Sequence, residues 1–99
     1  MGLKDDLIAA KALISTPDKW CKGIDSGKNC VMWAVGRATG TMTGNNNRWH
    51  EAEHALRKAL PGHYGGHPVV TFNDLPETTH ADIMALFDRA IAAQEKPNA

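Results

Sequence analysis

The stretch from Cys30 to Gly36 has no charged or strongly polar side chain, and it constrains the fold more than any other part of the chain. The apolar residues of one face are Val31, Ala34, Val35 and Ala38. They recur at i, i+3, i+4 and i+7, which is the spacing of a helix face. A helix that is apolar on every side belongs inside a domain, with neighbours around it. We therefore expect a buried central helix between Asn29 and Gly40, covered by the other segments.

Three further segments have helical periodicity or helical boundary signals. They are Leu3 to Ile14, roughly Arg48 to Leu60, and a final helix that begins at the capping box from Thr79 to Asp82. Val69 to Phe72 has strand composition, but four residues without a partner make a weak strand. The sequence thus predicts a mostly α, compact four-helix single domain over residues 1–99. It allows at most one short extended segment, near residues 69–72.

Charge and composition narrow the classes of function. Eleven basic residues balance eleven acidic ones, so no net field attracts nucleic acid or an anionic membrane. No apolar run approaches the length of a membrane span. Acidic residues stand near the N-terminus, where a signal peptide would carry positive charge and then an apolar run. We expect a cytoplasmic protein without a cofactor, whose two cysteines are free thiols.

The segment from His50 to His54 reads H-E-A-E-H and is the sharpest match to a catalytic motif. In zinc hydrolases with this pattern, two histidines one turn apart bind the metal and the glutamate activates water. Helical geometry turns His50 and His54 roughly 130° and 170° away from the apolar stripe of their helix, toward solvent. We interpret the motif as a polar helix face without a metal, and keep a zinc hydrolase as the alternative.

Cys30 is the second candidate for chemistry, because a helix N-terminus and the nearby Lys28 both favour its thiolate. A cysteine hydrolase also needs a histidine and an orienting amide or carboxylate. His67 and Asn73 are the available recruits, with Asp74 beside the latter. The opposing interpretation is structural, because cysteine is among the most buried residue types.

Three structural expectations accompany these candidates. Trp20 should fold back over the core from its polar loop. The Cys30 thiol should be buried, and Cys21, in the same loop as Trp20, should be the more accessible. Asn73 and Asp74 should shape the turn before the final helix by accepting hydrogen bonds from nearby backbone N–H groups, with the Asp74 carboxylate held toward the start of that helix.

Several short motifs together resemble a family of small uncharacterised bacterial and phage proteins with a domain of unknown function. The motifs are the Trp20 loop, Cys30 with Ala34-Val35-Gly36, Phe72-Asn73-Asp74, and Thr79 with Asp82-Ile83 and Ala90-Ile91. The resemblance spans most of the chain and implies a shared fold outline, but no activity and no site.

The leading interpretation of function is therefore a non-enzymatic protein-interaction module, phage-derived, whose partner is another protein. The alternative is a small hydrolase, either zinc-dependent through His50 and His54 or built on Cys30, His67 and Asn73. The sequence favours neither a nucleic-acid nor a membrane partner.

Overall fold

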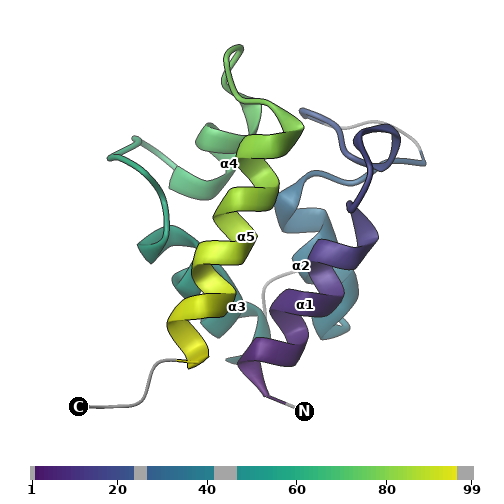
Figure 1. Cartoon of the computed structure of the whole chain (residues 1–99), viewed down its shortest axis with the longest axis vertical. Helices are drawn as coiled ribbons and strands as arrows, with labels where there is room; N and C mark the ends of the chain where they lie inside the picture. Colours follow the sequence, from purple (N-terminus) through teal and green to yellow (C-terminus); the bar gives the residue numbers. More distant parts are fainter. Residues whose placement is uncertain (1, 24–26, 42–46, 96–99) are drawn as a thin grey trace.

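Residues 2–23, 27–41 and 47–95, which the computed structural model describes, form five α-helices and one short 3₁₀ helix (Figure 1). The elements are α1 (Leu3–Leu13), η1 (Pro17–Lys19), α2 (Val31–Thr39), α3 (Asn47–Lys58), α4 (Pro68–Asp74) and α5 (His80–Glu95). These residues contain no β-strand, and their one β-bridge joins Trp20 to Asn29. The prediction of a mostly helical chain is confirmed, whereas the prediction of four helices is wrong.

The helix that the sequence did not predict is α4, which takes the place of the extended segment expected near residues 69–72. Pro68 occupies its first turn, where the fixed proline φ suits a helix and the missing N–H is not needed. The N–H of Thr71 closes that turn on the carbonyl of His67 at 2.8 Å. Val69 and Phe72, three residues apart, are buried on the same side. With no strand beside it, the segment gains more from helical packing than from its β-propensity.

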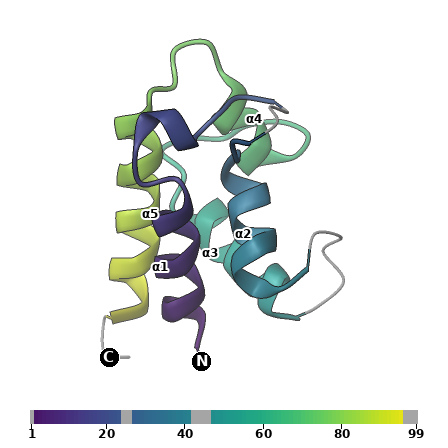
Figure 2. The same cartoon turned by 90° about the vertical axis from the view of Figure 1, so that its right-hand side faces the viewer.

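α1 and α5 lie side by side and run in opposite directions (Figure 2). Lys4 pairs with Glu95 at 3.6 Å, and Lys11 pairs with Asp88 at 2.6 Å. Exposed ion pairs of this kind contribute only about 0–1 kcal/mol each. The apolar contact between the helices therefore supplies most of the attraction. The buried apolar residues that α1, its C-cap residue and α5 contribute to the core are Leu7, Ala10, Ile14, Ile83, Leu86, Phe87 and Ala90.

α2 contributes strongly to the core but is not covered on every side. Val31, Ala34 and Val35 are fully buried, as the i, i+3, i+4 spacing predicts. Trp33 lies on the opposite face and is 42% exposed. The helix that packs against each of the other four is α3. The expected arrangement around a single central helix is thus not what the contacts describe, because all five helices contribute buried residues to one core.

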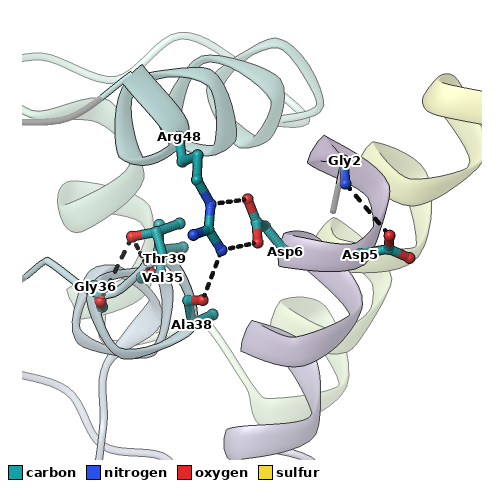
Figure 3. A network of polar contacts seen from close by, with 8 residues as sticks. All are labelled: Gly2, Asp5, Asp6, Val35, Gly36, Ala38, Thr39 and Arg48. Carbon is teal, nitrogen blue, oxygen red and sulfur yellow. Dashed lines mark hydrogen bonds and ion pairs between the residues drawn. The ribbon is translucent and has the colours of Figure 1, made fainter.

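A buried carboxylate ties three helices together (Figure 3). Asp6 of α1 is 2% exposed, and Arg48 of α3 donates to both of its oxygens, from Nε at 3.1 Å and from a terminal nitrogen at 2.7 Å. The same terminal nitrogen lies 3.4 Å from the carbonyl of Ala38 in α2. The hydrogen bonds from Arg48 to Asp6, together with the Asp6 charge, raise the pKa of Arg48 above its ordinary value. These hydrogen bonds of Arg48 fix the start of α3 against α1 and α2.

Candidate functional site

The H-E-A-E-H motif lies in the middle of α3, with both histidines on its exposed side. His50 and His54 are exposed, while Ala52 and Leu56 of the same helix are buried. His50 contacts the ring of Trp49 edge to face, with centroids 5.3 Å apart. Across the described ranges, no three histidine, cysteine, aspartate or glutamate side chains come together in a way that could hold a metal ion.

The same face of α3 forms one wall of a groove of about 680 Å³. The start of α1 and the last turns of α5 form the rest of the lining. Its apolar lining residues are Leu3, Ala55, Ala59 and Ala93. Its polar lining residues are His50, Glu51, His54, Lys58, Arg89 and Gln94. The groove therefore combines small apolar side chains with a rim of charged and imidazole groups.

The two ends of the groove differ in charge. Arg89 of α5 donates from Nε to the carbonyl of Ala59 at 2.9 Å, which places it beside Lys58 at the C-terminal end of α3. The other end lies next to Leu3, because the end of α5 meets the start of α1. Glu51 is the single carboxylate among the lining residues. One end thus carries two permanent positive charges.

The predicted order of exposure of the two thiols is wrong. Cys21 is buried, at 9% exposed, whereas Cys30 is half-buried at the residue preceding α2. The cause is the pairing of the Trp20 loop with Asn29. The N–H of Cys21 bonds to the Asn29 carbonyl at 3.2 Å, and the N–H of Asn29 bonds to the Lys19 carbonyl at 3.0 Å. This pairing turns Cys21 inward. The two cysteines do not form a disulfide with each other.

Asn73 sits at the centre of a buried hydrogen-bond cluster at the end of α4. Its Oδ1 accepts from the indole Nε1 of Trp20 at 2.7 Å and from the N–H of Val31 at 3.2 Å. Its Nδ2 donates to the carbonyl of Cys21 at 3.1 Å and to Oδ1 of Asp74 at 2.8 Å. Asn73 is 1% exposed. Each polar atom of the amide thus has two partners, and the side chain holds the Trp20 loop to the start of α2.

The local turn expected around Asn73 and Asp74 is replaced by long-range contacts. Asp74 Oδ1 accepts from the N–H of Gly23 at 2.8 Å, so its carboxylate does not point to the start of the last helix. That role belongs to Thr79 and Asp82, whose reciprocal bonds of 3.2 and 2.9 Å form the predicted capping box. Trp20 is half-buried and packs against the core, as expected.

The structure brings only part of the proposed cysteine set together. Asn73 reaches Val31, the residue after Cys30. His67 precedes α4, six residues before Asn73, and a helical rise of about 9 Å separates the two positions. His67 instead lines a separate hollow of about 500 Å³ beside α3, together with His50, Glu53 and Arg57 among others. Within the described part of the chain, no hydrogen bond joins the Cys30 thiol to an imidazole.

The histidine that approaches the Trp20 loop is His80, which belongs to no catalytic motif of the sequence. His80 lies 6.1 Å from the Trp20 ring, centroid to centroid, and its Nε2 is 2.8 Å from the carbonyl of Ile14. Lys58 and Arg89 were also missed as candidate site residues. Neither belongs to a recognisable motif, and both line the groove only because the end of α3 packs against α5.

Residues 2–93 match a family of unknown function, DUF6197. The chain belongs to this family. The match covers all five helices up to the last turn of α5, so the DUF6197 region contains the groove residues up to Ala93 and the whole Asn73 cluster. No curated protein and no solved structure matches the chain. None of the described helices is both long enough and apolar enough to cross a membrane.

Proposed function

We propose that the protein is a non-enzymatic protein-interaction module that holds a segment of another protein in the groove between α1, α3 and α5. The observation that carries this proposal is the groove itself. Its apolar lining residues, which we call its floor, are three alanines and Leu3, and its polar lining residues, which we call its rim, include Lys58 and Arg89. Apolar surface surrounded by a few placed polar groups is the usual composition of a recognition site.

The groove supports binding better than it supports either hydrolase. Its polar residues include imidazoles and a carboxylate, but the lining has no cysteine, serine or threonine to act as a nucleophile. His50 and His54 line it without a third protein ligand within the described residues. The alternative based on Cys30 has less support, because His67 and Asn73 stand at opposite ends of α4.

A cytoplasmic location and a phage-related origin belong to the same proposal. Two cysteines that are not joined in a disulfide are typical of a reducing compartment. The phage-related origin rests on the sequence resemblance described above.

Site-specific photo-crosslinking in the native host tests the proposed function. A photoreactive amino acid at His54, on the rim, should capture a defined protein partner. The same amino acid at Ala12, exposed on α1 outside the groove, is the matched control. Ala93→Trp should fill the groove and abolish the His54 cross-link while leaving the far-UV circular dichroism unchanged. Equal capture at both positions, or a His54 cross-link that persists in Ala93→Trp, would refute the proposal.

A further inference from the structure

We infer that the segment bound in this groove is an amphipathic helix of about two turns that carries carboxylate side chains at the end facing Lys58 and Arg89. This inference rests on the proposed function and specifies the chemistry of the partner. Its grounds are the length of the groove, the size of its floor residues and the distribution of charge along its rim.

The length and floor of the groove suit a helix. The wall formed by α3 and the residue after it extends from His50 to Ala59, nine steps along the chain, which corresponds to a rise of about 14 Å or between two and three turns. Ala55 and Ala59 stand one turn apart on this wall, and Ala93 lines the same groove from α5. Small side chains at this spacing leave room for the ridges of a third helix to enter between α3 and α5. Helices that bind in such grooves present apolar residues at i, i+3, i+4 and i+7.

The cationic end of the groove indicates where the carboxylates of the bound helix lie. Arg48 and Arg57 of α3 are already paired with Asp6 and Glu53. By contrast, neither Lys58 nor Arg89 forms an ion pair with any residue that the structure describes. The Nε bond to Ala59 orients the Arg89 guanidinium, and its terminal nitrogens form the edge that binds a carboxylate in bidentate fashion.

The opposite end of the groove disfavours carboxylate side chains. Glu51 lies about two turns before Lys58 on α3 and would repel an acidic residue placed beside it. Leu3 closes that end with an apolar side chain. The expected occupant therefore has its acidic residues at one end and apolar or basic residues at the other, which gives it a fixed direction in the groove.

Selection from a displayed library of random 12-residue peptides, with the purified full chain as the target, tests this inference. We expect the selected peptides to carry apolar residues at i, i+3 and i+4 with aspartate or glutamate at one end. Lys58→Glu should weaken their binding about tenfold, because it replaces an attraction with a repulsion at the acidic end. Lys19→Glu, an exposed position outside the groove, makes the same change of charge and should leave binding unaltered.

The outcomes separate this inference from the proposed function. Peptides that lose binding in Ala93→Trp but lack acidic residues or helical periodicity would overturn the inference and leave the docking groove in place. Equal weakening by Lys58→Glu and Lys19→Glu would overturn it as well, and so would a selection that yields no groove-dependent peptide. The proposed function is judged separately, by the cross-link at His54.

Discussion

The indole N–H of Trp20 donates a 2.7 Å hydrogen bond to Oδ1 of Asn73, which lies 53 residues further along the chain. The same oxygen accepts from the backbone N–H of Val31, at the start of α2. One side chain on α4 thus positions both a loop and a helix terminus. Such a cluster stabilises the fold when every polar group in it has a partner. The loss of one member destabilises the fold, because the groups that are left unpaired are buried.

Asn73→Ala should destabilise the fold strongly. The substitution leaves the N–H of Val31 and the carbonyl of Cys21 without their partner in a buried site, at a cost of about 2–3 kcal/mol. For a domain of this size, that lowers the melting temperature by roughly 8–24 °C. Thermal unfolding followed by circular dichroism measures the change. Asp74→Ala, at an exposed position, is the control and should cost less; a melting temperature for Asn73→Ala equal to that of the wild type would contradict the assignment.

The Asp6–Arg48 pair should respond unequally to removal of its two members. Asp6 is 2% exposed at its side chain and Arg48 is 43% exposed. Arg48→Met leaves a buried carboxylate unpaired and should cost up to about 3 kcal/mol. Asp6→Asn leaves a guanidinium that water can solvate and should cost about 1–2 kcal/mol. Urea unfolding of the two variants measures the difference. The double variant should regain part of the loss, and equal costs for the two single variants would argue against the burial of Asp6.

Cys30 should react with iodoacetamide faster than Cys21 in the native protein. Cys21 is buried within the Trp20 loop, whereas Cys30 is half-buried at the residue before α2. Mass spectrometry of the labelled peptides gives the two rates. Labelling in denaturant is the control and should proceed at similar rates at both positions. Faster native labelling of Cys21 would mean that the pairing of its loop with Asn29 opens readily.

Protein purified without a histidine tag should contain no stoichiometric zinc. His50 and His54 are exposed, and two imidazoles alone provide half of the tetrahedral set that a structural zinc needs. Elemental analysis tests this directly. One tightly held zinc per chain, lost in His50→Ala, would restore the zinc hydrolase as the leading alternative.

Helical periodicity predicted most of the fold because it is a local property. The spacing of Val31, Ala34 and Val35 located α2, and the Thr79–Asp82 capping box marked the start of α5. The segment around Val69 was mispredicted because its β-branched composition is also local, while the packing that made it helical is not. Periodicity likewise did not predict that Trp33 would face solvent.

Sequence motifs did not predict most of the candidate site. The exposed positions of His50 and His54 followed from counting around α3, but the groove beside them requires α5 to lie alongside. Arg89 acquires its position from the carbonyl of Ala59, 30 residues earlier in the chain. The sequence indicated a structural role for Asn73. Its partners, however, come from the Trp20 loop and α2, and only the folded chain creates these contacts.

Position 73 distinguishes amino acids that differ by a single atom. The environment presents two donors to one side of the amide, the Trp20 indole and the Val31 N–H, and two acceptors to the other, the Cys21 carbonyl and the Asp74 carboxylate. Aspartate has the shape of asparagine but would set an oxygen against those two acceptors. Spontaneous deamidation at this position would therefore act as a point mutation made after synthesis, releasing the Trp20 loop from α4 as the protein ages.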